Sequence, residues 1–361
     1  MRSDMGSEKL PCILPWKALF MDERESRLSA VPCCANWIRQ GYGAIGPDAT
    51  MDELWNGRGA REIRRLLSEG RQAELCQPDC PWLMSGRFSE GALTVLPGPP
   101  AFEENQRLNN REIAERKQVL KSSPMAIRII PTLHCNIRCR MCHQDHRAKL
   151  LLPEAFMADV RRIGPCVYDY QLHGGEVLIS RRLHEWVDPE WFAANPQMLL
   201  SLITNATKLP AYNWPILQRV RINYLTVSLN AATRVTYRYI MGANLFDDVI
   251  YNIIALRDLG RQHALRKFQV FLSFVIMRSN YSEVPLFVQL AQELGLPFRL
   301  LLVVGNRLDE SLCTEPTVLR EALHVLEEAE RLAPCESRLE VERVQRSLRE
   351  ALTASAAGRN L

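Results

Sequence analysis

Short apolar runs alternate with amphipathic stretches from Ala126 onward, and this alternation restricts the fold more than any other feature of the sequence. Apolar runs bounded by turn formers indicate strands, and the stretches between them indicate helices. The strands are predicted at residues 126–131, 168–172, 198–203, 224–229, 269–276 and 299–304. The clearest helices are predicted at residues 153–163, 245–259 and 282–294. Strands that alternate with helices form a parallel sheet, so the predicted fold class is α/β. Six such units are fewer than a closed eight-unit barrel needs.

Three further segments flank this region. Residues 1–100 are rich in turn formers and contain one amphipathic stretch, 51–69, so we predict a small, loop-rich, cysteine-rich module. The run Pro-Gly-Pro-Pro that ends this segment breaks regular structure and marks a boundary. We expect a helix or linker over 101–125, the α/β domain over 126–306, and charged C-terminal helices over 307–361.

The charge balance excludes several classes of partner. Lys and Arg number 45 against 41 Asp and Glu, and a net charge of +4 is too small to predict binding to nucleic acid or to a membrane surface. No apolar run reaches the ~18 residues of a membrane span, and the first residues do not resemble a secretion signal. We therefore expect a cytoplasmic protein without a membrane partner.

Eleven cysteines are the most informative part of the composition. In a reducing cytoplasm, many thiols indicate metal binding or redox chemistry more often than disulfides. Five lie near the amino terminus and three form a tight cluster, so we predict two metal sites. The two groups are Cys12, Cys33, Cys34, Cys76 and Cys80, and then Cys135, Cys139 and Cys142.

The tight cluster has the spacing C-x3-C-x2-C and follows the first predicted strand. Such a loop can wrap three thiolates around one face of an iron-sulfur cubane and leave one iron free for another ligand. A zinc site is the alternative, with a fourth ligand from a nearby histidine. The candidates for that ligand are His134, His143 and His146.

This triplet, with Met141 as the apolar residue before its last cysteine, resembles the motif of the radical S-adenosylmethionine (radical SAM) enzymes. Other residues of that family's pattern follow in order at predicted strand ends, where parallel barrels bind ligands. The resemblance covers Ala126 to Asn306 and implies a partial TIM-like barrel of six strand and helix units. It also implies a 4Fe-4S cluster held by Cys135, Cys139 and Cys142. The residues implied to bind S-adenosylmethionine are Met141, Gly174, Gly175, Glu176, Asn205, Ser228, Asn230 and Arg238.

The resemblance implies a specific chemistry. An electron from the reduced cluster cleaves S-adenosylmethionine into methionine and a 5'-deoxyadenosyl radical, which takes hydrogen from the substrate. A flavodoxin- or ferredoxin-type protein is the expected electron donor. Three positions depart from the family's usual residues, namely Val177, Ala206 and Met241. Met241 stands where an arginine is common, and Arg238 is expected to substitute for that arginine.

The amino-terminal cysteines are similar to the SPASM module, which normally follows a radical SAM barrel rather than preceding it. The similarity implies an auxiliary 4Fe-4S cluster that relays electrons, with Cys12, Cys33, Cys76 and Cys80 as ligands. Cys33 follows Pro32, as in the family's Pro-Cys pair, and is preferred to Cys34. A structural zinc ion in the same four thiolates is the alternative.

The resemblance predicts an oxidoreductase that acts on a small natural product or a peptide. Hydrogen abstraction would lead to oxidation, crosslinking or epimerisation, and Cys313 is a candidate hydrogen donor or second-cluster ligand, or a plain packed thiol. The interior has no run of basic residues of the kind that binds a nucleotide. A non-catalytic electron carrier or scaffold is the alternative function, supported by the three departures named above.

Overall fold

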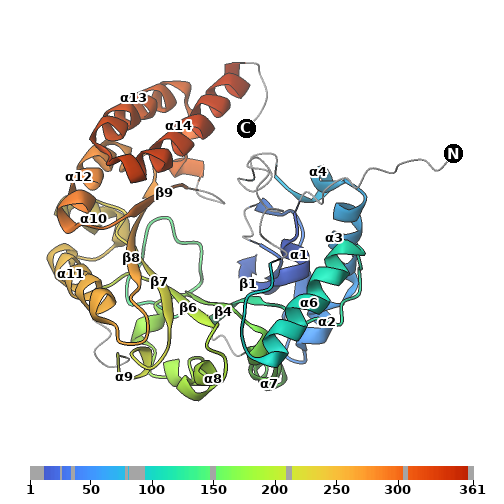
Figure 1. Cartoon of the computed structure of the whole chain (residues 1–361). Coiled ribbons are helices and arrows are strands. Elements are labelled where there is room, and N and C mark those ends of the chain that lie inside the picture. The colour runs from blue at the N-terminus through green and yellow to red at the C-terminus, as the bar shows by residue number, and fades with distance from the viewer. Residues whose placement is uncertain are drawn as a thin grey trace. The chain divides into compact units, whose positions relative to one another are not determined.

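The computed structural model describes residues 12–24, 27–33, 37–77, 80, 94–146, 152–208, 214–303 and 308–356. Contacts divide the chain into two compact units, and Figure 1 labels most of their helices and strands. The first unit comprises Met1–Pro131, Lys149–Gln171 and Asp188–Leu199. The second comprises Thr132–Ala148, Leu172–Val187 and Leu200–Leu361.

The first unit contains strands that the sequence analysis did not predict. They are β1 (Ala18–Arg24), β2 (Arg27–Val31) and β3 (Gly43–Ala44). β1 pairs antiparallel with β2, and β2 pairs antiparallel with β3. β1 also pairs in parallel with β4 (Ala126–Thr132), which brings Ala18 opposite Ala126. The expectation of a loop-rich segment therefore missed a small sheet.

Helices complete the first unit. The predicted amphipathic stretch 51–69 is two helices, α2 (Met51–Trp55) and α3 (Arg58–Ser68), with Gly57 as the N-cap of α3. Buried Arg64 of α3 donates from Nε to the carbonyl of Pro15 at 2.9 Å and from Nη1 to the carbonyl of Gln118 at 2.8 Å. Because these carbonyls belong to distant segments, Arg64 holds the unit's loops together. The other helices are α1 (Leu14–Lys17), α4 (Gln72–Leu75), α6 (Pro100–Ala114), α7 (Glu154–Ile163) and α8 (Pro189–Ala194).

The second unit holds the later strands of the parallel sheet. β6 pairs with β7, β7 with β8 and β8 with β9, all in parallel. The strands are β6 (Leu199–Thr204), β7 (Ile222–Ser228), β8 (Gln269–Ile276) and β9 (Phe298–Leu302), while β5 (Asp169–Gly174) crosses the boundary between the units. The helices that alternate with them are α9 (Trp214–Leu217), α10 (Arg234–Met241), α11 (Phe246–Gln262) and α12 (Val284–Leu294).

The six predicted strands correspond to β4 to β9, with ends within about two residues of the predicted ones. The hydrogen-bonded strand order ends at β9, so the barrel is partial rather than closed. Two helices, α13 (Pro316–Leu332) and α14 (Cys335–Ala356), form the C-terminal end and flank Pro334. The predicted fold class is therefore confirmed. None of the described helices has both the length and the apolar character needed to cross a membrane.

Candidate functional site

The three clustered cysteines line one cavity of about 340 Å³ in the second unit. The loop that follows β4 supplies them, and the other walls come from the carboxyl ends of β5, β6, β7 and β8. Six of the eight residues predicted to bind S-adenosylmethionine line the same cavity. They are Met141, Gly174, Gly175, Asn205, Ser228 and Asn230.

The three thiols lie close enough to influence one another. Burial, followed by the neighbouring thiols of Cys142 and Cys135, raises the pKa of Cys139 to about 12. Burial also raises the pKa of Cys135. Thiols must lose their protons to bind iron, so metal binding here would release protons. A close group of three thiols beside an open cavity fits a 4Fe-4S cluster that has a free iron.

The histidines considered for a zinc site are placed differently from one another. His134 is exposed, whereas His143 and His146 line the cavity. Nδ1 of His146 lies 2.9 Å from the carbonyl oxygen of Leu133, and a carbonyl can only accept a hydrogen bond. Among the residues that the structure describes, no three Cys, His, Asp or Glu side chains are placed to hold a single metal ion.

The glycine turn after β5 is attached to the cysteine loop through the backbone. The N–H of Gly175 donates to the carbonyl of Thr132 at 2.8 Å, and the N–H of Glu176 donates to the carbonyl of His134 at 2.9 Å. A Cβ at residue 175 would lie 2.1 Å from the oxygen of His134. Only glycine allows this approach, so the second glycine of the motif has a packing role as well as a lining role.

Glu176 lies behind the cavity wall rather than in it. Its carboxylate accepts hydrogen bonds from the N–H of Asn205 at 2.6 Å, the hydroxyl of Thr204 at 2.8 Å and the N–H of Leu178 at 3.0 Å. Burial raises the pKa of this carboxyl, and the three donors lower it. The side chain is 1% exposed and is absent from the described lining of the cavity. The structure therefore places this carboxylate as a brace for the end of β6.

Asn205 connects β6 to the cysteine loop. Its Nδ2 donates to Oδ1 of Asn136 at 3.1 Å and lies 3.6 Å from Sγ of Cys135. Nδ2 of Asn136 in turn donates to Oγ1 of Thr207 at 2.7 Å. Hydrogen bonds to a ligand sulfur tune a cluster's reduction potential, so this amide would act on an iron held by Cys135 as well as on the fold. The sequence analysis missed Asn136 and Thr207, which no motif singles out.

The departures from the family pattern have structural counterparts. Ala206 adopts a left-handed backbone with φ of +52°, which explains why glycine is common at this position. Met241 is buried in the cavity wall and accepts a hydrogen bond at Sδ from Nδ2 of Asn230 at 3.3 Å. Arg238 is exposed and does not belong to the described lining.

The four amino-terminal cysteines line a second cavity, within the first unit. Burial raises the pKa of Cys12 to about 12, and the nearby Cys76 and Cys80 contribute. Cys76 pairs with Ile38 in a β-bridge, which joins the second cysteine pair to the segment that follows Cys33. The predicted ligand set is thus gathered around one space. Cys34, the alternative to Cys33, lies outside the described residues.

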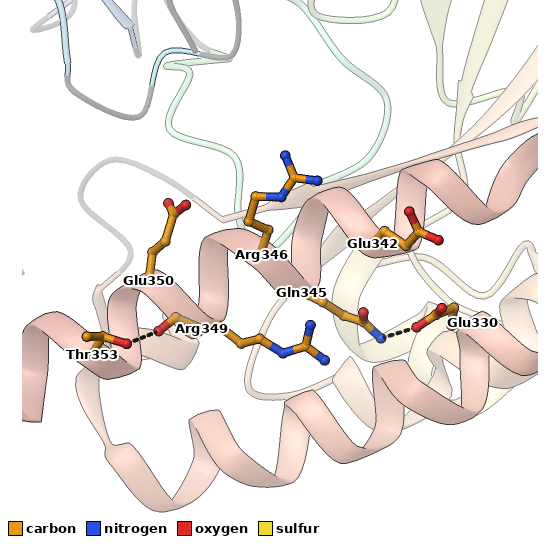
Figure 2. A pocket seen from close by; sticks show the side chains of 7 residues that line it. All are labelled: Glu330, Glu342, Gln345, Arg346, Arg349, Glu350 and Thr353. Carbon is orange, nitrogen blue, oxygen red and sulfur yellow. Dashed lines mark hydrogen bonds between the residues drawn. The ribbon is translucent and has the colours of Figure 1, made fainter. Parts of the chain in front are cut away.

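A third hollow, on the C-terminal helices, has a different character. Figure 2 shows Gln345 and Arg349 of α14 pointing toward α13, and Arg346 and Glu350 pointing away from it. Nε2 of Gln345 donates to Glu330 at 2.9 Å. The lining mixes both signs of charge and is open to solvent. These side chains form a solvent-exposed face of the helix pair. The described lining residues do not point toward a common position that a ligand could occupy.

Three cysteines remain outside the two groups, namely Cys166, Cys313 and Cys335. Cys313 is half-buried in a short 3-10 helix, and its N–H donates to Oγ of Ser311 at 3.2 Å. It is not among the described residues that line the cavity. Cys166 is half-buried in another such helix, and Cys335 begins α14 and is exposed.

Comparison with known proteins agrees with this geometry. Residues 129–291 match the model of the radical SAM superfamily, so this part of the chain is a radical SAM domain. Its cofactors are accordingly a 4Fe-4S cluster and S-adenosylmethionine. The prediction of the family is confirmed.

Curated relatives match over the same region. A probable GTP 3',8-cyclase of Saccharolobus islandicus is 31% identical over 176 residues, 47% of this chain and 54% of the relative. A probable GTP 3',8-cyclase of Thermoplasma volcanium is 25% identical over 180 residues, 47% of this chain and 51% of the relative. The chain therefore spans about half the length of the curated relatives it matches.

Among solved structures, SuiB of Streptococcus suis is similar with 13% identity and a TM-score of 0.47, over 86% of this chain and 67% of that protein. SuiB bound to S-adenosylmethionine gives 15% identity and a TM-score of 0.44, over the same shares of both chains.

Two glycines with the same backbone conformation give a matched test of the cysteine loop. Gly242 and Gly295 both end helices in the left-handed region, at φ of +66° and +63°. A Cβ at 242 would lie 2.4 Å from the carbonyl oxygen of Arg138, whereas a Cβ at 295 meets its nearest atom at 3.7 Å. We expect Gly295→Ala to lower the free energy of unfolding by about 1 kcal/mol and to leave the iron content at the wild-type level. Gly242→Ala should cost more and lower iron retention. Thermal unfolding and iron content after anaerobic reconstitution measure both, and equal iron retention would contradict the contact.

A second prediction concerns Glu176. In Glu176→Gln the side-chain amide nitrogen must face one of the three donors that the carboxylate now accepts, so the end of β6 should shift. We expect the dissociation constant for S-adenosylmethionine to rise about ten- to hundredfold, or about 1.4–3 kcal/mol, while iron content stays at the wild-type level. Equilibrium dialysis of the reconstituted protein measures this. Glu293→Gln, at an exposed position on α12, is the control. Wild-type affinity for S-adenosylmethionine in Glu176→Gln would contradict the role of this carboxylate as a brace for β6.

Proposed function

We propose that this chain is a radical SAM oxidoreductase whose S-adenosylmethionine-binding cluster is held by Cys135, Cys139 and Cys142. The observation that carries the proposal is the cavity itself, which gathers the cysteine loop and the ends of four strands around about 340 Å³. Convergence of these separate segments on one space supports a single binding site. When bound, the cluster and S-adenosylmethionine supply a 5'-deoxyadenosyl radical that removes hydrogen from the substrate.

The chain's own residues have distinct tasks in this proposal. The three thiolates hold the cluster, and the backbone of Gly174 and Gly175 forms the wall along which the methionine part of the cofactor would lie. Ser228 and Asn230 line the side formed by β7. Lining by Ile203, Met241 and Val275 excludes water, which protects a reactive radical from quenching.

The first unit would hold an auxiliary 4Fe-4S cluster on Cys12, Cys33, Cys76 and Cys80. Its support is the placement of all four thiols around one cavity. Four thiolates saturate a cluster, so such a centre would exchange electrons without binding substrate. We propose that it accepts the second electron when the substrate radical is oxidised. A zinc ion bound by the same four thiolates could not exchange electrons, so the first unit would then have a purely structural role.

We propose a small natural product or a peptide as substrate, with oxidation, crosslinking or epimerisation as the outcome. The curated relatives are named for GTP, and a triphosphate is normally bound by lysine or arginine. The described residues that line the cavity include neither, which favours a less charged substrate. Loss of S-adenosylmethionine cleavage, leaving an electron carrier or scaffold, is the alternative, and Met241 in place of a cation is the observation behind it.

Cysteine variants separate the two proposed clusters. We expect Cys139→Ala to abolish 5'-deoxyadenosine formation, because the cluster loses one of its three ligands. Cys76→Ala should leave some uncoupled cleavage and stop formation of the oxidised product. Chromatography of 5'-deoxyadenosine after anaerobic reduction with dithionite gives the readout. An absence of 5'-deoxyadenosine from the wild type would support the scaffold, and normal turnover by Cys76→Ala would remove the redox role of the first unit.

Metal content tests the auxiliary cluster independently of turnover. Two cubane clusters predict about eight irons per chain in the reconstituted wild type, falling to about four when the triplet Cys135, Cys139 and Cys142 is replaced by alanine. Iron and sulfide analysis with Mössbauer spectra of both proteins gives these numbers. About four irons falling to none, with one zinc ion retained, would assign a structural zinc to the first unit.

A further inference from the structure

One face of α10 presents large apolar side chains to solvent. Val235 is 81% exposed and Tyr239 is 52% exposed, and they lie one helical turn apart. Arg234 and Arg238 occupy the same exposed side of the helix. An apolar centre bordered by arginines is typical of transient protein interfaces, in which arginine and tyrosine are enriched.

This surface continues directly into the cysteine loop. The guanidinium of Arg140 stacks over the ring of Tyr239 at 4.7 Å. The N–H of Arg140 donates to the carbonyl of Ile240 at 2.7 Å, and Gly242 packs against the carbonyl of Arg138. Arg140 is the residue after Cys139. A protein seated on α10 would therefore touch the segment that carries a cluster ligand.

The α10 face, defined as Arg140, Arg234, Val235, Arg238 and Tyr239, is positively charged. Two carboxylates contact its arginines. Exposed Asp247 pairs with Arg234 at 2.8 Å, and Glu310, which pairs with Arg140, is itself 3% exposed. Three arginines against these two carboxylates leave one net positive charge beside an apolar centre. Such a surface attracts an acidic partner and repels a basic one.

We propose that the α10 face is the docking surface for an acidic one-electron carrier protein of the flavodoxin or ferredoxin type. This rests on the proposed function, which needs a single electron at the cluster for each cleavage of S-adenosylmethionine. In the docked step one electron leaves the reduced carrier, which becomes oxidised, and enters the oxidised cluster. No bond or proton moves in that step. Charge complementarity and the contact with the segment that carries Cys139 favour this partner over a second copy of the chain, whose own α10 face would be equally cationic.

Charge substitutions at Val235 test the proposal. This residue is the second of α10, where a negative side chain favours the helix and a positive one costs little, so both variants should fold. Reduction is compared by two routes: a bacterial flavodoxin driven by NADPH and its reductase, at subsaturating concentration, and dithionite. With flavodoxin we expect Val235→Glu to form 5'-deoxyadenosine about five- to tenfold more slowly than wild type, and Val235→Lys to keep a rate within about twofold of it. With dithionite all three should be equal.

Direct binding and a remote control complete the experiment. A titration of flavodoxin into each reconstituted protein should show the same order of affinity, weakened by added salt. Leu339→Glu makes the same chemical change at a residue 73% exposed on α14 and should behave as wild type. Equal flavodoxin rates and affinities in Val235→Glu and Val235→Lys would overturn the docking surface, as would a matching loss with dithionite. Failure of the wild type with dithionite would instead refute the proposed function.

Discussion

The buried carboxylate of Glu176 is the interaction on which the rest of the site depends. It accepts three hydrogen bonds, two of them from the end of β6 at Thr204 and Asn205. The same residue donates its N–H to the carbonyl of His134 in the cysteine loop. One side chain and its own backbone therefore fix three segments against one another. A carboxylate removed from water is stable only when its oxygens are satisfied, so these donors cannot move without a large cost.

Much of the fold could be predicted because short stretches of sequence determine its strands and helices. β4 to β9 are short apolar runs with turn formers at their ends, and each was found within about two residues of its predicted limits. β1 was missed for a physical reason. Its apolar residues end at Met21, its second half is charged, and its pairing with β4 joins residues about a hundred positions apart. Nothing in the sequence near Ala18 indicates that partner, since the stability of a strand depends on the strands beside it.

The site divides in the same way between local and distant information. Spacing alone indicated the cysteine loop, and order along the chain indicated the strand ends that line the cavity with it. The contacts that hold the loop come from far away: Glu310 pairs with Arg140 across 170 positions, and Asn205 reaches Asn136 across 69. A pattern could name Glu176 but could not show that its oxygens serve β6 instead of the cavity. Likewise, Arg238 lies one turn before Met241, yet Arg238 is exposed while Met241 is buried, and the spacing of the two residues does not reveal that difference.

The cysteine loop faces the cavity on one side and the protein surface on the other. Cys139 and Met141 line the cavity, while Arg140 between them turns outward to Tyr239 and Glu310. Alternation of this kind would let one short segment hold the proposed cluster beside the cavity and still contact a docked protein on its outer side. In the proposed function, an electron would then enter from the outer side of the loop and the substrate from the cavity. Since a radical formed in that cavity would have to be kept from solvent, an electron path through the loop would suit the proposed chemistry.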